Sequence, residues 1–189
     1  MISGLRTLAA AILLWTIAAP AVADWTAEDL SATLKSRDAD QVRFKERRDI
    51  SYLSQPLVSE GIMRLEDGVL IKSVTAPEPE TFEVRDKKIV HIAADKSETR
   101  LDIAEHPVLQ VLAVTLRAVL DGDLAPLRTL LTLEVSGAQS GWTLRMSPRD
   151  GPLRDHLRDI VIEGRGADVG RIAIDQRNGD KTVIQIEHE

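Results

Sequence analysis

The chain has 189 residues, a formal net charge of −6 and no cysteine. A mildly acidic chain without a basic stretch is unsuited to binding nucleic acid or anionic lipid by charge, because both attract positively charged surfaces. The absence of cysteine excludes disulfides, thiolate nucleophiles and cysteine-ligated zinc, and also a lipid anchor on an N-terminal cysteine. We therefore expect no nucleic-acid partner.

Residues 1–23 have the composition of an export signal. Arg6 supplies the positive charge, residues 8–19 (LAAAILLWTIAA) supply the apolar core, and Ala21-Val22-Ala23 supplies the small residues before a cleavage site. The apolar run is shorter than the roughly 20 residues that span a bilayer, which argues against a membrane anchor. We expect cleavage before Asp24 and a single domain over residues 24–189, located in the periplasm and monomeric.

Residues 25–105 predict one helix followed by a meander of short strands. Thr26 and Asp29 have the spacing of a capping box, which predicts a helix ending near Arg37. From Gln41 onwards apolar and polar residues alternate, and this period of two is typical of strands with one buried face. The first predicted strand starts at Gln41; the others cover 57–65, 69–74, 81–86, 88–94 and 98–103, with a turn at Asp67-Gly68 and with Thr99, Leu101 and Ile103 facing inward.

Pro107 ends this alternation and is a favourable first residue for a helix. Residues 108–120 (VLQVLAVTLRAVL) predict a helix that is apolar almost all the way round. The remaining predictions are a second short helix through Leu127 and Leu130, strands at 131–137 and 142–147, a short helix at 153–157, and two or three closing strands with a hairpin turn at Asn178-Gly179. The predicted fold class is α+β, mainly antiparallel β, with inserted helices in one domain.

The histidines and carboxylates form no recognisable catalytic motif. His91 is expected to be a packed histidine within a strand, His106 to lie at a helix entrance and His188 in the terminal tail. His156 lies between Asp155 and Asp159, which would suit two metal ligands on one helix face, but no second cluster has ligand spacing. The chain also lacks the usual motifs of serine hydrolases, zinc peptidases and phosphate-binding loops. We therefore predict neither catalysis nor a metal or cofactor.

Apolar side chains exceed what a simple meander requires. In the segment 69–74 (VLIKSV), Val69 and Ile71 point to one face and Leu70 and Val74 to the other. The helix 108–120 is apolar around its circumference. One explanation is plain burial of a central strand and a core helix between layers. The other is a curved sheet around a hydrophobic cavity, with the helix as its lid.

The order of these segments resembles the LolA-like family, the periplasmic carriers of outer-membrane lipoproteins. The capped helix precedes VRFKERRDISYL (42–53) and PLVSEGIMRL (56–65), in which Gly61 matches the family's recurring glycine in the second strand. TAPEPETFEVRDKKIVHI (75–92), the inserted helical pair, the Gly141-Trp142 strand and the closing hairpin continue the same order. The resemblance covers roughly residues 25–187.

This resemblance implies an open, curved half-barrel sheet lidded by helices, whose apolar interior holds the acyl chains of a lipoprotein. It implies an inner-membrane donor complex and an outer-membrane acceptor as partners, and neither reaction nor cofactor. The second apolar face of residues 69–74 would then face helix 108–120 and the cavity between them. The residues expected at the cavity and its lid are Phe44, Met63, Leu65, Leu70, Val74, Phe82, Val84, Leu109, Leu112, Leu116, Leu144 and Met146.

Two departures from the family pattern bear on the cargo. Glu66-Asp67-Gly68 stands where carriers of lipoproteins often have an arginine-proline pair implicated in lid control. The segment after residue 23 also has only five aromatic residues of the Phe, Trp and Tyr types, whereas the family's cavities are usually aromatic-rich. The chain thus resembles the divergent members encoded beside acyltransferase and polyene-lipid pathways, and its cargo is expected to be a lipoprotein or another acylated molecule. A lipid hydrolase using His91 or Asp155, His156 and Asp159, and a structural assembly protein, are the alternatives.

Overall fold

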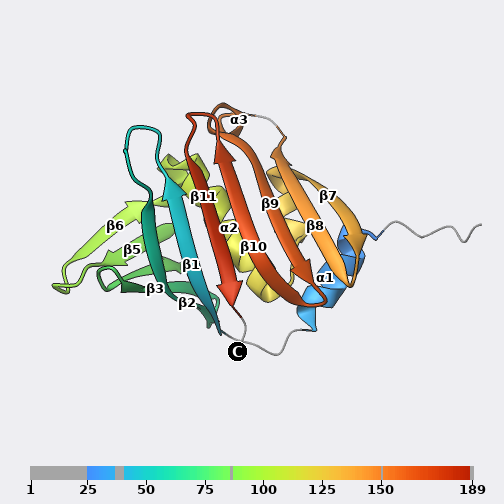
Figure 1. Ribbon diagram of the computed structural model, residues 1–189, viewed down its shortest axis with the longest axis horizontal. Coiled ribbons are helices and arrows are strands. Elements are labelled where there is room, and N and C mark those ends of the chain that lie inside the picture. Colours follow the sequence, from blue (N-terminus) through green and yellow to red (C-terminus); the bar gives the residue numbers. More distant parts are fainter. Residues whose placement is uncertain (1–24, 37–40, 86, 150, 188–189) are drawn as a thin grey trace, which may run out of the picture.

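The computed structural model describes residues 25–36, 41–85, 87–149 and 151–187. The export signal predicted for residues 1–23 lies outside these ranges. Eleven antiparallel strands form one sheet in the order β6-β5-β4-β3-β2-β1-β11-β10-β9-β8-β7 (Figure 1). The strands are β1 (Gln41–Asp49), β2 (Leu57–Glu66), β3 (Val69–Ala76), β4 (Glu80–Arg85), β5 (Lys88–Ile92), β6 (Glu98–Asp102), β7 (Leu131–Ala138), β8 (Gly141–Pro148), β9 (Leu157–Arg165), β10 (Asp168–Gln176) and β11 (Lys181–Glu187).

Two meanders build this sheet and meet at its centre. Strands β1 to β6 follow one another outward from the centre on one side, and strands β7 to β11 follow one another inward from the other edge. The first and last strands pair in the middle, with Phe44 opposite Ile186 and Glu46 opposite Ile184. The sheet stays open, with β6 and β7 as its two edges. The predicted α+β fold, mainly antiparallel and open, is confirmed.

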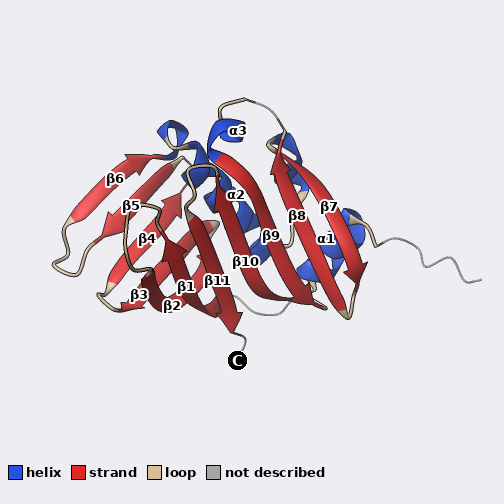
Figure 2. Ribbon diagram, turned by 45° about the horizontal axis from the view of Figure 1, so that its top comes forward, coloured by secondary structure: helices blue, strands red, loops and turns tan. Residues whose placement is uncertain are grey.

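The helices lie on the inner side of the curved sheet (Figure 2). They are α1 (Ala27–Lys35), η1 (Ile103–Glu105), α2 (Pro107–Asp121), η2 (Ala125–Thr129) and α3 (Leu153–His156). The longest of them, α2, crosses behind the middle of the sheet. No helix in the described part of the chain is long and apolar enough to cross a bilayer.

Local sequence features position α1 against the end of α2. The predicted capping box forms, because the Asp29 N–H donates to Thr26 Oγ1 at 3.2 Å and the Thr26 N–H donates to Asp29 Oδ2 at 3.0 Å. Gly122 ends α2 with a φ of 70°, and a Cβ there would lie 2.5 Å from the Lys35 nitrogen. Ser31 Oγ donates to the Gly122 carbonyl at 2.6 Å. Glycine is therefore required both by the turn and by the close approach of the two helices.

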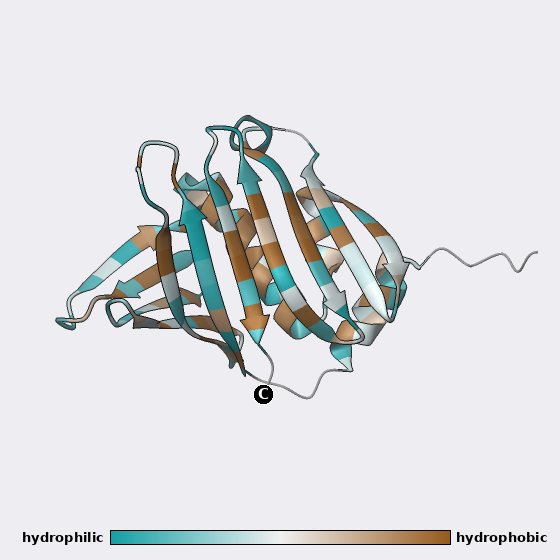
Figure 3. Cartoon of the chain, in the orientation of Figure 1, coloured by the Kyte–Doolittle hydropathy of each residue, from teal (hydrophilic) through white to brown (hydrophobic). Residues whose placement is uncertain are grey.

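The core runs along the inner face of the sheet. Brown and teal bands alternate along β9, β10 and β11 in Figure 3, as expected for strands with one buried face. The alternating inward side chains Ile160, Ile162 and Ile172 are completely or almost completely buried. On β3 both faces are buried, because Ile71 on the outer face lies between Arg64 and Glu83 of the neighbouring strands. Long charged side chains cover apolar neighbours with their aliphatic stems.

Some sequence predictions need correction. Leu101 is 38% exposed rather than inward-packed, because β6 is the edge strand and all its side chains are exposed. The second short helix is the 3-10 helix η2, and the helix predicted at 153–157 ends at His156, because β9 begins at Leu157. The first helix ends at Lys35 rather than near Arg37. The turns at Asp67-Gly68 and Asn178-Gly179 form as predicted, with positive φ at Asp67, Gly68 and Gly179.

Candidate functional site

A cavity of about 240 Å³ lies between the first three turns of α2 and the inner face of strands β1 to β5, with β10 and β11 also contributing to its wall. The helix contributes Val108, Leu109, Leu112, Ala113 and Leu116 to its wall. This spacing of three and four residues defines one face of a helix. The sheet contributes the apolar residues Leu70, Val74, Phe82, Val84, Ile89 and Ile174 on the opposite side. The inner face of residues 69–74 therefore faces α2 across this space.

The structure places the twelve predicted cavity and lid residues in three different environments. Seven line the cavity: Leu70, Val74, Phe82, Val84, Leu109, Leu112 and Leu116. Four are buried in the core and do not line the cavity: Phe44, Met63, Leu144 and Met146. Leu65 is partly buried and packs against the core. Alternation assigns a side chain to the inner face, but it does not indicate whether a helix or an empty space lies opposite.

A buried ion pair crosses the sheet on the cavity wall. Glu46 of β1 is only 5% exposed, and its Oε2 contacts the Lys72 ammonium of β3. Ser59 Oγ donates to the same carboxylate oxygen at 3.3 Å, and the Lys72 Nζ lies 4.8 Å from the centre of the Phe44 ring. Strand β2 lies between β1 and β3 and places Gly61 opposite Phe44. The missing side chain at Gly61 leaves the Glu46 carboxylate and the Lys72 ammonium free to meet across β2. A carboxylate with so little exposure to water needs an oppositely charged partner, because moving a charge out of water is costly.

A second polar pair lies on the neighbouring strands. His91 Nε2 is 2.8 Å from Glu80 Oε2, and the His91 ring stacks on Phe82 at a centroid distance of 4.6 Å. Glu80 and Phe82 line the cavity. Both His91 contacts agree with the packed histidine predicted from the sequence. These two contacts place the imidazole at the edge of the cavity. They explain the position of His91 by packing, without a catalytic role.

One end of the cavity has a polar rim made by Arg48, Gln176 and Thr182. Arg48 is exposed and, within the described residues, no ion pair involves it. The polar wall and rim were missed by the sequence reasoning, which considered only apolar residues for the cavity. A usable signal was present, because Glu46 follows Val42 and Phe44 in the inward register, and Lys72 lies between Leu70 and Val74.

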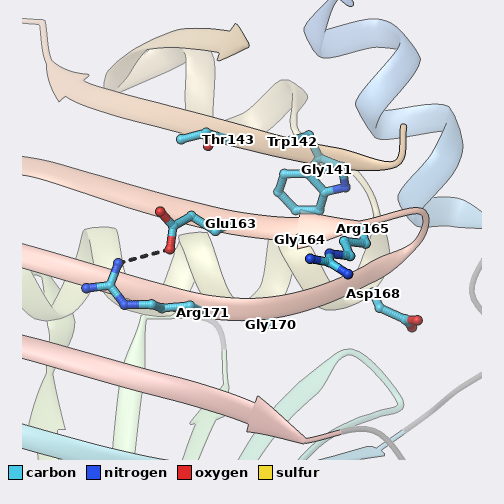
Figure 4. A pocket seen from close by; sticks show the side chains of 9 residues that line it. All are labelled: Gly141, Trp142, Thr143, Glu163, Gly164, Arg165, Asp168, Gly170 and Arg171. Carbon is cyan, nitrogen blue, oxygen red and sulfur yellow. Dashed lines mark hydrogen bonds and ion pairs between the residues drawn. The ribbon is translucent and has the colours of Figure 1, made fainter. Parts of the chain in front are cut away.

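A shallower depression of about 480 Å³ lies at the ends of β8, β9 and β10 (Figure 4). Gly141 and Gly170 contribute no side chain to it, and a Cβ at either position would meet no atom closer than 3.8 Å. Gly164 is required below the Trp142 indole, because a Cβ there would lie 2.3 Å from Trp142 Cζ2. The ion pair beside it, between Arg171 and Glu163 at 3.1 Å, is about half exposed, and such pairs contribute little.

The residues considered for a metal or a hydrolytic site do not gather. His156 is the last residue of α3, whereas Asp159 lies in β9 and pairs with Arg145. Asp155 and His156 are exposed. Across the part of the chain that the structure describes, no group of three histidine, aspartate or glutamate side chains is placed to hold a metal ion. The single helix face considered for these residues does not form, because α3 ends at His156 and Asp159 lies in a strand.

The comparison with known proteins identifies a family. The family described as "Outer membrane lipoprotein carrier protein LolA-like" matches residues 18–185. Among curated proteins, none matches the sequence significantly.

Similar solved structures share little sequence with this chain. A LolA superfamily protein from Nitrosomonas europaea is 11% identical, with 84% of this chain and 90% of that chain covered and a TM-score of 0.44. MucB in complex with MucA(peri) is 12% identical, with 86% and 56% covered and a TM-score of 0.38. A putative outer membrane lipoprotein-sorting protein domain from Vibrio parahaemolyticus is 8% identical, with 86% and 92% covered and a TM-score of 0.33. These likenesses are distant, and nothing about function follows from them. The family match, by contrast, spans most of the chain, and the protein therefore belongs to the LolA-like family of outer membrane lipoprotein carrier proteins.

Proposed function

We propose that this protein is a periplasmic carrier that binds the acyl chains of a lipoprotein or another acylated molecule between α2 and the β1–β6 meander. The observation that carries the proposal is the cavity itself, whose helix side is entirely apolar and whose sheet side contributes six apolar side chains beside a polar wall and rim. Burying an acyl chain in such a space contributes about 0.8 kcal/mol per methylene. The protein would act as a monomer without a cofactor or a chemical reaction, receiving cargo from an inner-membrane donor and passing it to an outer-membrane acceptor.

The size of the cavity bears on how cargo enters. Ligand sites usually measure about 300–1,000 Å³, and this cavity, at about 240 Å³, falls just below that range. A long acyl chain therefore requires α2 to move outward. The start of α2 is suited to such a movement, because Leu109 is 36% exposed and Val108 and Leu112 are only partly buried. The later turns are held by fully buried side chains, Thr115 and Val119 among them.

Titration with a fluorescent fatty acid tests the proposal on three variants of α2. Leu112→Ala removes apolar wall, and Ala113→Leu fills part of the cavity, so both should weaken binding about tenfold. Leu120→Ala is the matched control, because Leu120 is a partly buried leucine of the same helix that packs against the core and does not line the cavity. It should bind the probe as the wild type does.

Native mass spectrometry of protein purified from the periplasm addresses the natural cargo. A retained acylated molecule that is lost in Ala113→Leu supports the carrier. A wild type that carries no lipid and never binds the probe refutes it and leaves a structural protein with a plain core. Turnover of an acyl ester, lost on His91→Gln, would instead favour the lipid hydrolase.

A further inference from the structure

Exposed apolar side chains concentrate at one place outside the cavity, the hairpin between β1 and β2. The described residues include six large apolar side chains that are well exposed. Four of these lie within seven residues of this hairpin: Tyr52 (82%), Leu53 (41%), Leu57 (41%) and Val58 (59%). A single exposed leucine is ordinary on a protein surface, whereas a cluster indicates a contact surface. Residues 50–59 are called the hairpin tip below.

The hairpin tip is also uncharged. Its sequence ISYLSQPLVS contains no charged residue, although 29% of the residues in the chain are charged. Charges begin directly on either side of it, with Asp49 before and Glu60 after. An uncharged apolar segment enters a lipid interface at little cost, whereas a charged side chain there is expensive. Tyrosine and leucine side chains are moreover suited to the boundary between headgroups and acyl chains.

The base of the hairpin tip is held in place by the neighbouring hairpin. The Ser51 N–H donates to Asp180 Oδ1 at 2.8 Å, and Asn178 Nδ2 donates to the other carboxylate oxygen at 2.8 Å. The Leu53 N–H donates to the Ile50 carbonyl at 2.9 Å within the turn. In Figure 1 the loop extends outward from the end of the sheet, at the same end as the β10–β11 hairpin. The exposed side chains are therefore presented outward.

The hairpin tip adjoins the rim of the cavity. Ser59 at its end and Arg48, two residues before its start, both line the cavity. Arg48 pairs with Leu57 across the hairpin, and its guanidinium forms no ion pair with the rest of the described chain. A free guanidinium directly below an apolar tip is placed to contact a lipid phosphate when the tip enters the acyl region. Arg47, in contrast, is engaged by Asp49 through two hydrogen bonds of 2.7 and 2.9 Å.

We propose that the hairpin tip docks on a lipid bilayer, inserting Tyr52, Leu53 and Val58 at the interface so that the rim of the cavity faces the membrane. A bilayer suits a projecting tip better than a protein partner does, because lipid needs no complementary pocket. The chain is acidic overall, so attachment depends on the apolar tip and not on general attraction to anionic lipid. The purpose of this docking, the transfer of an acyl chain, rests on the proposed carrier function, but the docking itself does not.

Flotation of the mature protein with phosphatidylcholine vesicles tests this docking. The wild type should float with the vesicles, and adding phosphatidylglycerol should change the bound fraction less than twofold. Replacing the tip side chains in Tyr52→Ser/Leu53→Ser/Val58→Ser should lower the bound fraction at least fivefold. The matched control is Leu101→Ser, which removes a leucine of similar exposure from the edge strand β6 and should leave flotation unchanged.

Thermal stability, binding of the fatty-acid probe and oligomeric state are measured beside flotation. Thermal melts should show the tip variant as stable as the wild type, and the fluorescent fatty acid should bind both equally in the absence of vesicles. If the probe fails to bind while flotation depends on the tip, the carrier function fails and the docking stands. If the wild type does not float, or the tip variant floats equally well, the docking is refuted. Loss of a wild-type dimer in the tip variant, without flotation of either, would make the tip a contact between copies of the chain and would also refute it.

Discussion

The two halves of the sheet differ in what their inner faces meet. On the β7–β11 side, α1 and η2 contact β7, α2 passes behind the strands (Figure 1), and side chains such as Leu144, Ile160 and Ile162 are excluded from water. On the β1–β6 side, the same α2 leaves a cavity, and Glu46 and Lys72 lie on its wall. One helix therefore serves two purposes. Its stripe with Val111, Thr115 and Val119 belongs to the core, and its stripe with Leu109 and Leu112 faces the cavity.

This contrast teaches that equal hydrophobicity does not imply equal contribution to stability. A side chain in a filled core loses its partners when it is truncated, and the remaining hole is costly. A side chain on the wall of a cavity already borders empty space, so its truncation removes fewer contacts. The four predictions below test this difference, beginning with the largest effect.

Ile162→Ala and Leu112→Ala compare the two halves directly. Ile162 is 1% exposed in the filled half, and its truncation should lower the free energy of unfolding by about 2–5 kcal/mol. Leu112 is only partly buried and lines the cavity, so its truncation should cost about 1 kcal/mol or less. Urea denaturation of both variants measures the difference. Equal losses would mean that α2 is packed as core on both faces.

Lys72→Met tests the ion pair that distinguishes the β1–β6 half. The substitution keeps a side chain of similar length but leaves the Glu46 carboxylate without its cation, which should destabilise the protein by about 2–3 kcal/mol. The double variant Glu46→Gln/Lys72→Met should recover most of this loss, because the unpaired charge is then removed. Chemical denaturation of Glu46→Gln, Lys72→Met and the double variant, compared with the wild type, gives a double-mutant cycle for the ion pair. A double variant as unstable as Lys72→Met contradicts the account.

Thr115→Val tests the packing of the α2 stripe that belongs to the core. The Thr115 hydroxyl is fully buried, and it has no hydrogen-bond partner among the described residues. Replacement by the similarly shaped valine removes an unsatisfied polar atom, which should raise the free energy of unfolding by about 1 kcal/mol. Thermal and urea denaturation measure it. A destabilised variant would indicate that the hydroxyl is hydrogen-bonded, for example to water.

The smallest effect concerns Asp180 at the base of the hairpin tip. The hydrogen bond from the Ser51 backbone N–H, with smaller contributions from the Asn178 and Ser51 side chains, lowers the pKa of Asp180 below its ordinary value of 3.8. A carboxyl group whose pKa is lowered on folding contributes stability above its unfolded pKa and loses it as the pH falls through the folded pKa. The anchoring of the tip should therefore persist at neutral pH and weaken only below pH 3.8. The amide proton shift of Ser51, followed by NMR, should titrate with a midpoint below that value, and a midpoint at or above it would contradict the assignment.

The sequence alone determined the local elements, because their causes act over a few residues. Thr26 and Asp29 formed the predicted capping box, and Gly68 and Gly179 made the predicted turns, since each motif contains its own hydrogen bonds or backbone preference. Alternation likewise assigned Leu70 and Val74 to the inner face of β3. Together with the resemblance in segment order, these patterns were sufficient for the open antiparallel sheet and its inserted helices.

Only the tertiary structure decided what each inward side chain meets. Phe44 and Phe82 have the same alternating pattern, yet Phe44 on the central strand β1 is core, whereas Phe82 on β4, nearer the edge of the sheet, lines the cavity. Glu46 and Lys72 lie 26 residues apart and meet because β1, β2 and β3 are neighbours in a fixed register. Such meetings depend on strand register and on the angle of a helix, and both are set by the packing of the whole chain rather than by any short segment of it.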